Sequence, residues 1–324
     1  MLASRSSDAI PGADLDVAPW MWVAFLGIIV AALVIDLLLH RNDHEIEFRE
    51  ALITSVIWIS VGVAFSLVIW WWLGGGAAGQ YLTGYVIEKS LSVDNVFVWA
   101  VIFSYFAVPK MYQHRVLFWG VFGALVLRAV FIFAGVALLD AFSWMLYVFG
   151  AFLVVTAFRV ARHDNSEIHP EKNPVLRIMR RLVPVSSDYH GQKFWVRVDA
   201  RRFATPLLVV LVMVEATDVV FAVDSIPAIL AVTRSEFIVF TSNAFAILGL
   251  RALYFLLAGA AGKLRYLNVG LGVILGYVGI KMIISDLYHV PTLLSLGVIV
   301  VVLTVTVVAS LRAEQRDPRP NPEV

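Results

Sequence analysis

The sequence predicts an all-α polytopic membrane protein, a bundle of about nine transmembrane helices that contains two inverted three-helix repeats. Three observations lead to this fold class. Of the 324 residues, 60% are hydrophobic and only 15% are charged, whereas about a quarter of the residues in a soluble domain are charged. Apolar stretches long enough to cross a bilayer recur along the chain, and one acidic motif occurs twice in similar surroundings. Lipid must therefore be part of the solvent of this chain.

Each predicted span contains about 20 mainly apolar residues, the length that crosses a hydrocarbon core of about 30 Å. Short segments of alternating polarity, which are typical of a transmembrane β-barrel, do not occur in the sequence. The nine spans are predicted at residues 18–39, 51–73, 81–106, 115–138, 143–160, 205–232, 236–259, 264–285 and 291–311.

The basic residues between the spans predict the orientation. With an external N-terminus, the internal segments hold 19 Lys and Arg residues, whereas the external segments hold only Arg5 and Arg234. Cytoplasmic loops carry an excess of Lys and Arg. We therefore expect a protein of the bacterial cytoplasmic (inner) membrane, with its N-terminus outside and its C-terminus in the cytoplasm. No cleavable signal peptide is evident before the first span.

The spans and loops divide the chain into five parts. A short external segment precedes a first membrane half with spans one to five, and a long basic cytoplasmic loop connects it to a second half. A polar, Pro-rich tail at the end is expected to be disordered. These parts are residues 1–17, 18–160, 161–204, 205–311 and 312–324.

An internal repeat relates spans 3–5 (residues 81–160) to spans 6–8 (residues 205–285). Both copies contain an acid, five further residues, a second acid and a small polar residue: Glu88, Asp94 and Asn95 in span 3, and Asp218, Asp224 and Ser225 in span 6. One helix later, Arg128 matches Arg251. Because three helices are an odd number, the second copy must run through the membrane in the opposite direction. Inverted repeats around a site at the bilayer midplane are a common plan of secondary transporters.

The ionisable residues inside the spans are candidates for a functional site, because each charge near a helix centre costs about 2.5–3.5 kcal/mol even on an insertion scale. The acids are Asp36, Glu88, Asp94, Glu215, Asp218 and Asp224, and the bases are Lys89, Arg128, Arg251 and Lys281. An excess of two acids suits one divalent cation, and protonation would balance it equally well. Each arginine is expected either to neutralise carboxylates in an empty carrier or to form a permanent salt bridge.

The oxygen-rich side chains predict a site for a hard metal cation. The predicted ligands are Glu88, Asp94, Asn95, Glu215, Asp218 and Asp224, with Arg128, Arg251, Asp36 and Lys281 as supporting charges. Pro227 has no N–H, so we expect the helix to kink or unwind beside Asp224. The chain has no cysteine, and its seven histidines lie in loops or at span ends. These features favour Mg²⁺, Ca²⁺ or Mn²⁺ and do not separate the three ions.

Three segments of the sequence resemble signatures of the TerC family. They are Gly84–Phe97 (GYVIEKSLSVDNVF), Asp218–Ala228 (DVVFAVDSIPA) and Thr241–Ala252 (TSNAFAILGLRA). The resemblance extends from about Asp36 to Pro291 and is greatest to the Alx branch. It implies a LysE-like transporter from a family linked to tellurium resistance, whose Alx-type members are associated with manganese export. It also implies that the five matched acids Glu88, Asp94, Glu215, Asp218 and Asp224 matter for transport.

The expected function is a secondary transporter that exports Mn²⁺ through the carboxylate site by alternating access, coupled to proton entry. Such a protein is not an enzyme, holds no permanent cofactor, and has cations, protons and lipid as partners. The net charge of +1 gives no reason to expect a nucleic-acid partner. A membrane-embedded hydrolase is an alternative, but the sequence lacks an H-E-x-x-H motif. A further alternative is a scaffold that organises metal and tellurium stress-response proteins through the 161–204 loop. The sequence leaves the oligomeric state open.

Overall fold

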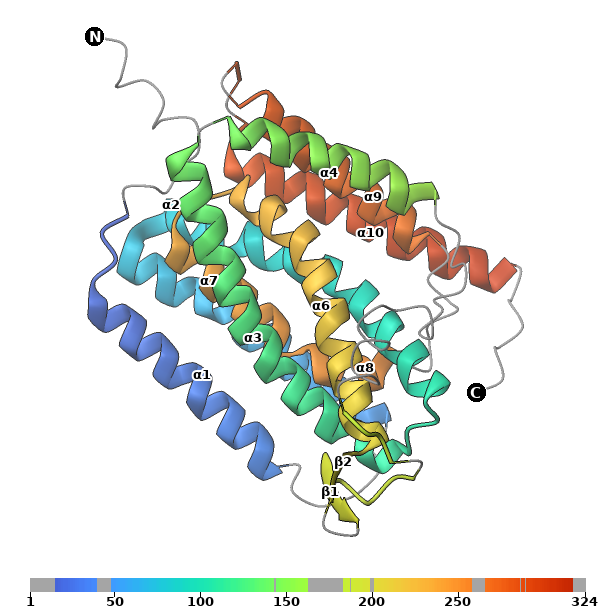
Figure 1. The fold of residues 1–324 in the computed structure, drawn as a ribbon. Helices are drawn as coiled ribbons and strands as arrows, with labels where there is room; N and C mark the ends of the chain where they lie inside the picture. The colour runs from blue at the N-terminus through green and yellow to red at the C-terminus, as the bar shows by residue number, and fades with distance from the viewer. Residues whose placement is uncertain are drawn as a thin grey trace.

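The computed structural model describes residues 15–39, 48–142, 144–162, 183–186, 188–198, 201–257, 266–285, 287–288 and 290–316. Nearly all of its regular structure is helical (Figure 1), which confirms the predicted all-α polytopic fold class. The helices are α1 (Pro19–Leu39), α2 (Phe48–Tyr105), α3 (Lys110–Ala141), α4 (Met145–Arg162), α6 (Pro206–Leu230), α7 (Glu236–Leu248), α8 (Leu250–Leu257), α9 (Leu267–Ile283) and α10 (Thr292–Arg316). The strands are β1 (Trp195–Val198) and β2 (Arg201–Ala204).

Seven membrane spans are long and apolar enough to cross a bilayer within the described part of the chain, counting α7 and α8 together. The long helix α2 contains both the second and the third predicted spans. Helix α9 coincides with the eighth predicted span but has only 17 residues. Every predicted span thus overlaps a helix, while the number of membrane crossings and the inverted repeat stay predictions.

Two short breaks differ from the predicted span boundaries. The loop expected between the second and third spans is reduced to Gly74, whose φ of 87° and ψ of 174° interrupt α2, and the chain is helical again at once. A positive φ of this size favours glycine because glycine has no Cβ. The seventh predicted span is divided at Gly249 into α7 and α8.

The helices α7 and α8 lie at the centre of the bundle. In the most apolar 18-residue stretch of this span, 94% of the residues are buried inside the protein. In the corresponding stretches of α1 and α10 the share is only 17%. Exposed apolar side chains are stable on the outer helices because lipid surrounds them. The buried Phe245 of α7 packs against Phe65 of α2 with ring centroids 4.5 Å apart.

Helices α4 and α9 pack closely side by side (Figure 1). Glycines make this approach possible. A Cβ on Gly279 would lie 2.8 Å from the carbonyl oxygen of Gly150, and one on Gly272 would lie 2.8 Å from that of Ala157. Small residues at helix interfaces are typical of membrane proteins, where close backbone packing replaces the hydrophobic effect as the force that joins helices.

A β-hairpin precedes α6 within the predicted 161–204 loop, and this element was not predicted. Strands β1 and β2 are antiparallel, with Trp195 opposite Ala204 and Arg197 opposite Arg202. Thr205 holds the base of the hairpin, because its Oγ1 donates to the carbonyl oxygen of Lys193 at 2.7 Å. Thr205 then serves as the N-cap residue of α6.

Two contacts connect the 183–194 segment to the helix ends beside it. The hydroxyl of Tyr189 donates to the carbonyl oxygen of Phe106 at 2.7 Å. Burial raises the pKa of Tyr189 to about 12, so this phenol stays protonated and remains a donor at neutral pH. The guanidinium of Arg115 lies 5.3 Å from the ring centroid of Phe194.

The predicted tail also differs from the structure. Helix α10 continues to Arg316, so the first five residues of the segment 312–324 are helical rather than disordered. A basic residue in the last turn of a helix interacts favourably with the partial negative charge of its C-terminus. Residues 1–14 and 317–324 lie outside the described part of the chain.

Candidate functional site

Two of the predicted acids meet at one arginine in the interior of the bundle. Arg128 of α3 donates from Nη2 to Oδ1 of Asp218 at 2.8 Å and from Nε to Oδ2 at 3.2 Å. Its Nη1 forms a second ion pair with Oε1 of Glu88. All three side chains are at most 2% exposed. Arg128 therefore connects α2 to α6 through a bidentate contact on one side and a further carboxylate on the other.

Three neutral side chains form further hydrogen bonds with this ion triad. Ser92 donates to Oε1 of Glu88 at 3.4 Å, and Asn95 donates from Nδ2 to Oδ1 of Asp218 at 3.5 Å. Ser225 Oγ accepts from Nη1 of Arg128 at 3.3 Å. Asn95 of span 3 and Ser225, its counterpart in span 6, thus lie beside the same arginine.

The triad carries a net charge and has unpartnered oxygen atoms at its edge. One guanidinium faces two carboxylates, so the formal charge of the three side chains is −1 when both acids are ionised. Oε2 of Glu88 and Oδ1 of Asn95 are buried and have no hydrogen-bond partner among the described residues. Buried oxygen atoms without a donor raise the free energy of the folded protein, and a cation or a water molecule would lower it.

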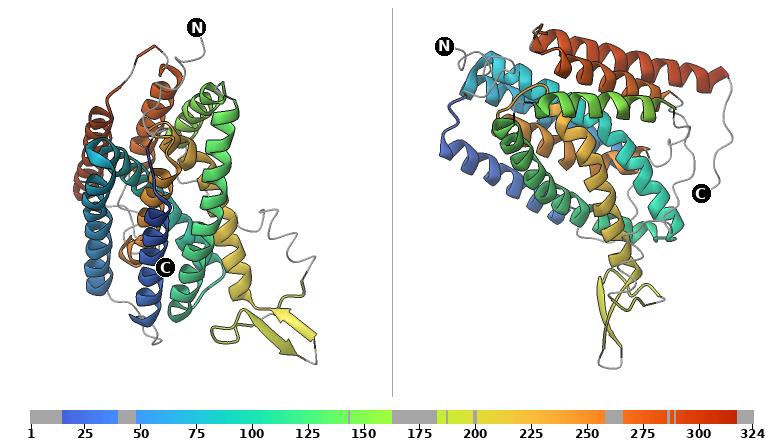
Figure 2. Two further views of the ribbon diagram at one scale, coloured as in Figure 1. Left: turned by 90° about the vertical axis from the view of Figure 1, so that its left-hand side faces the viewer. Right: turned by 45° about the horizontal axis from the view of Figure 1, so that its top comes forward.

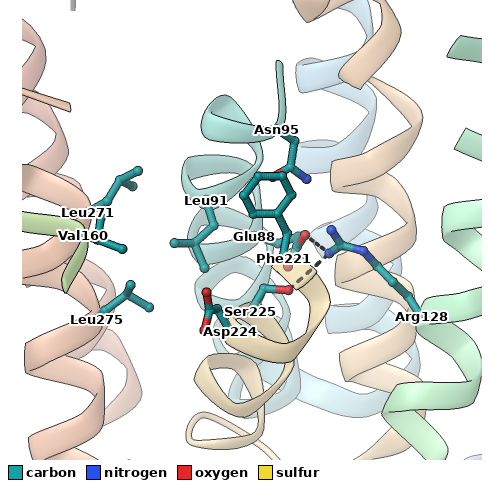
Figure 3. A pocket seen from close by; sticks show the side chains of 10 residues that line it. All are labelled: Glu88, Leu91, Asn95, Arg128, Val160, Phe221, Asp224, Ser225, Leu271 and Leu275. Atoms are coloured by element: carbon teal, nitrogen blue, oxygen red, sulfur yellow. Dashed lines mark hydrogen bonds and ion pairs between the residues drawn. The ribbon is translucent and has the colours of Figure 1, made fainter. Parts of the chain in front are cut away.

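These groups line a cavity of about 50 Å³ (Figure 3). This volume exceeds the roughly 10–15 Å³ needed for one water molecule. The polar residues that line it are Glu88, Asn95, Arg128, Asp224 and Ser225, and the apolar residues are Leu91, Val160, Phe221, Leu271 and Leu275. Figure 3 shows Val160, Leu271 and Leu275 on the side opposite Arg128. The α4–α9 pair therefore supplies an apolar wall against a polar wall from α2, α3 and α6.

Asp224 lies in the cavity apart from the ion triad. Thr156 of α4 donates from Oγ1 to Oδ1 of Asp224 at 3.4 Å. Sequence reasoning missed Thr156, although a hydroxyl inside an otherwise apolar span was a visible signal. The apolar wall was also missed, because no sequence pattern distinguishes Val160 or Leu271 from ordinary lipid-facing or core residues.

Glu215 lies on another part of the surface of α6. It packs against α3 at Gly123, where an added Cβ would collide with the carboxylate of Glu215. Its Oε2 is buried and has no hydrogen-bond partner in the part of the chain that the structure describes. Glu215 does not line the cavity. The side chain of Asp94 lies outside the described residues, although its backbone belongs to α2.

The predicted ligands are thus only partly brought together. Glu88, Asn95 and Asp224 share the cavity, Asp218 contacts Arg128 without lining it, and Glu215 does not line it either. Within the described ranges, no group of three or more His, Asp or Glu side chains is close enough to hold a metal ion. Arg128 itself lies between Glu88 and Asp218 and forms an ion pair with each.

Arg251, the counterpart of Arg128 in the repeat, binds elsewhere. It forms an ion pair with Asp36 of α1. These two residues line a small hollow of about 10 Å³ together with Thr54 and Trp58. Nearby, Lys89 donates from Nζ to the carbonyl oxygen of Ala246 at 3.1 Å. The fourth supporting charge, Lys281, is half-buried on α9 and does not line the cavity.

The helix break expected beside Asp224 is not seen. Helix α6 continues through Pro227 as far as Leu230. Pro227 still leaves the carbonyl of Val223 without its usual donor, because proline has no N–H. A helix break that was not predicted lies at Gly249, between α7 and α8.

Comparison with known proteins gives one family. The family model described as "Integral membrane protein TerC family" matches residues 73–318. The chain is 48% identical to an uncharacterized membrane protein of Myxococcus xanthus over 302 residues. The aligned part is 93% of this chain and 95% of that protein.

Two further relatives carry the name "Putative membrane-bound redox modulator Alx". The protein of Photorhabdus laumondii is 47% identical over 306 residues, which is 91% of this chain and 95% of the relative. The protein of Escherichia coli K12 is 46% identical over 298 residues, which is 89% of this chain and 93% of the relative. No solved structure matches the chain.

Proposed function

Because this chain belongs to the TerC family of integral membrane proteins, we propose that it is a secondary transporter that exports a divalent metal cation, Mn²⁺ above all, from the cytoplasm. One observation carries the proposal. Glu88, Asn95, Asp224 and Ser225 place oxygen ligands around one buried cavity, and a tethered guanidinium stands among them. Intramembrane acids of this kind mark ion pathways by default.

The donor set supports a hard cation. Carboxylate, amide and hydroxyl oxygens suit Mg²⁺, Ca²⁺ and Mn²⁺, and the cavity has no histidine or cysteine in its lining. The choice of Mn²⁺ among these ions rests on the resemblance to Alx-type proteins. The name of the relatives is compatible with this choice, because a change in the cellular content of a redox-active metal alters redox balance. Thiol exchange is excluded for this chain, which contains no cysteine.

Arg128 acts in this proposal as a built-in substitute for the cation. In the empty carrier its guanidinium compensates Glu88 and Asp218. An arriving dication would compete for the same carboxylates, together with Asp224 and the free oxygens of Glu88 and Asn95. Arg128 cannot lose its proton, so it can move aside but cannot become neutral. The empty protein could then change conformation without leaving bare negative charge in a low dielectric.

Export of a dication needs an energy source. Moving one charge against the membrane potential costs about 2.3 kcal/mol per 100 mV, and the dication carries two. Proton entry through the carboxylates that the metal has left would supply this energy. The carboxylates of this site can bind either a metal ion or protons, which is the property that an antiporter requires.

The orientation belongs to the same proposal, with the N-terminus outside and the C-terminus in the cytoplasm. The natural absence of cysteine makes it testable by single cysteines. Cysteines at Gly76 and Arg234 should react with an impermeant maleimide added to whole cells. Those at Tyr112 and Gly191 should react only after permeabilisation. External labelling at Gly191 would contradict both the orientation and the inverted repeat.

Transport by the purified protein in proteoliposomes tests the proposed function, with Mn²⁺, Ca²⁺ and Mg²⁺ compared side by side. Asp94→Asn and Asp224→Asn should each abolish Mn²⁺ transport, because each removes an anionic ligand at nearly constant volume. Asn95→Ala and Ser225→Ala should reduce it less. Asp140→Asn at the end of α3 is the matched control and should transport normally.

Two outcomes would exclude the proposed site. Full Mn²⁺ transport by the double variant Asp94→Asn/Asp224→Asn would show that the carboxylates are not needed. Loss of cellular function on replacement of the 161–204 loop, with normal function of Asp94→Asn, would favour the scaffold instead. Protein level in the membrane must be measured for every variant, so that failed insertion is not read as failed transport.

A further inference from the structure

The outer face of the β-hairpin carries two arginines and a tryptophan. Residues on one face of an antiparallel pair lie directly opposite each other or two positions apart along a strand. The register places Arg197 opposite Arg202 and Trp195 opposite Ala204, so Trp195, Arg197 and Arg202 share one face. We call these three residues the hairpin face. Trp195 is 51% exposed, and both arginines are exposed.

The arginine pair is unfavourable unless an anion binds to it. Like charges directly opposite each other destabilise a strand pair. Neither Arg197 nor Arg202 forms an ion pair with a carboxylate among the described residues. Trp195, Val196, Arg197 and Arg202 line an open hollow of about 390 Å³. The hollow is therefore lined by two arginines and an indole, and it has room for a ligand larger than a simple ion.

The hairpin lies where the membrane surface must be. Ala204 ends β2, and α6 begins two residues later at Pro206. At about 3.3 Å per residue, Arg202 is within roughly 10 Å of the residue that caps this membrane helix. The left view of Figure 2 shows the hairpin reaching sideways beyond the edge of the helical bundle. The hairpin thus extends beyond the helices, over the region that lipid would occupy in the proposed orientation.

The base of the hairpin is fixed, which holds the face in place. Thr205 N donates to the carbonyl oxygen of Phe194 at 3.0 Å, and Ala204 N donates to that of Pro184 at 3.0 Å. An isolated two-stranded hairpin is only marginally stable in water. These connections to the 183–194 segment therefore stabilise a hairpin whose exposed side is available for a ligand.

We propose that the hairpin face binds the headgroup of an anionic phospholipid in the cytoplasmic leaflet. A guanidinium binds phosphate oxygens in a bidentate manner, and the indole of Trp prefers the level of the headgroups. Anionic lipids give the cytoplasmic surface a negative potential, which complements two adjacent arginines. The inference rests on the orientation proposed above and does not depend on the transported ion. A bound lipid would anchor the start of α6, the helix that carries Asp218 and Asp224.

The test uses the full-length protein in mild detergent, with phosphatidylglycerol, phosphatidylcholine and inorganic phosphate as probes. The rise in thermal unfolding midpoint with probe concentration measures binding. Phosphatidylglycerol should raise the midpoint of the wild type and phosphatidylcholine should not. Arg197→Gln/Arg202→Gln should weaken the apparent affinity for phosphatidylglycerol about 30-fold, which corresponds to about 2 kcal/mol at about 1 kcal/mol for each basic residue.

The matched control removes two arginines that the proposed orientation places on the same side of the membrane as the hairpin. Arg312 and Arg316 lie exposed in the last turns of α10, and Arg312→Gln/Arg316→Gln should keep the wild-type affinity. Equal loss in both double variants would overturn the proposal, because it would show general attraction rather than a site. An equal midpoint shift with inorganic phosphate would also overturn it, because it would show a site for a free anion.

A second measurement places the hairpin at the membrane. In proteoliposomes, the fluorescence difference between the wild type and Trp195→Phe reports on this one indole. Headgroup-spin-labelled phosphatidylglycerol should quench that difference, and quenching should fall in Arg197→Gln/Arg202→Gln. Absence of quenching in the wild type would overturn the proposal and leave the face to an acidic protein partner. The same double variant is also assayed for Mn²⁺ transport, which we expect to be normal. This assay distinguishes failure of this inference from failure of the proposed function.

Discussion

Arg128 and Arg251 occupy equivalent positions in the two predicted repeats, but the structure engages them differently. Arg128 binds Glu88 of α2 and Asp218 of α6, one acid from each repeat. Arg251 binds Asp36 of α1, a helix outside both repeats. The side chain of Asp36 is 13% exposed, whereas both partners of Arg128 are at most 2% exposed. One arginine therefore lies in the candidate site, and the other binds an acid outside that site.

The difference shows that equivalent sequence positions need not do equivalent work in one conformation. Glu88 and Asp218 are themselves equivalent in the repeat, and both are bound by the single residue Arg128. We infer that the protein is asymmetric about this acid pair, with one half supplying the arginine. If transport proceeds by alternating access, Arg251 is the residue that would approach the acids in the opposite conformation. Substitutions of Arg128, Arg251 and Thr156 test this comparison.

The largest effect is expected for Arg128→Gln. Removing one partner of a buried ion pair typically costs about 3–5 kcal/mol, because the other charge stays buried without compensation. Thermal unfolding of the purified variant should show this loss. The triple variant Glu88→Gln/Arg128→Gln/Asp218→Asn should recover most of the stability, because it removes the charges together, but it should not transport.

The same variant separates the two hypotheses for Arg128. If the arginine stands in for the cation, a folded Arg128→Gln protein should bind Mn²⁺ at least as tightly as the wild type but turn over slowly. If the arginine is only a structural salt bridge, the variant should be poorly inserted. Normal stability together with normal turnover would contradict both.

Arg251→Gln should have a smaller effect, about 1–3 kcal/mol, because its partner is partly exposed and water can compensate the remaining carboxylate. Adding Asp36→Asn should restore the stability. Transport assays then test the asymmetry. Turnover that stays slow in the stable double variant would show that Arg251 takes part in the cycle, whereas normal turnover would confine it to structure.

Thr156→Val should have the smallest effect. It removes a long hydrogen bond of 3.4 Å to Asp224 at nearly constant volume, worth about 0.5–1 kcal/mol. We expect transport to fall about two- to fivefold, with Thr156→Ser close to the wild type. A fall as large as that of Asp224→Asn would mean that Thr156 itself binds the cation. No change in transport in either variant would mean that α4 does not contribute to the site.

The predicted elements succeeded or failed for physical reasons. Every predicted span overlaps a helix, because about 20 apolar residues in lipid have few alternatives to an α-helix. The hairpin at residues 195–204 was missed, because two strands of four residues in a charged loop have no marked periodicity. The break expected at Pro227 was wrong: α6 stays helical through the proline, although the proline removes one backbone hydrogen bond. The break at Gly249 was also missed, although a glycine after an apolar segment is a local signal for the end of a helix.

The sequence by itself determined the membrane environment, the positions of the spans and the list of intramembrane charges, since hydropathy and the cost of a buried charge act residue by residue. It also determined that Glu88 and Asp218 are candidates for one site. Only the tertiary structure decided which charges meet. It placed Arg128 between Glu88 and Asp218, set Asp224 beside Thr156, turned Glu215 towards Gly123 and paired Arg251 with Asp36. These contacts join residues as far as 215 positions apart, and the helix packing that brings them together is a property of the whole chain.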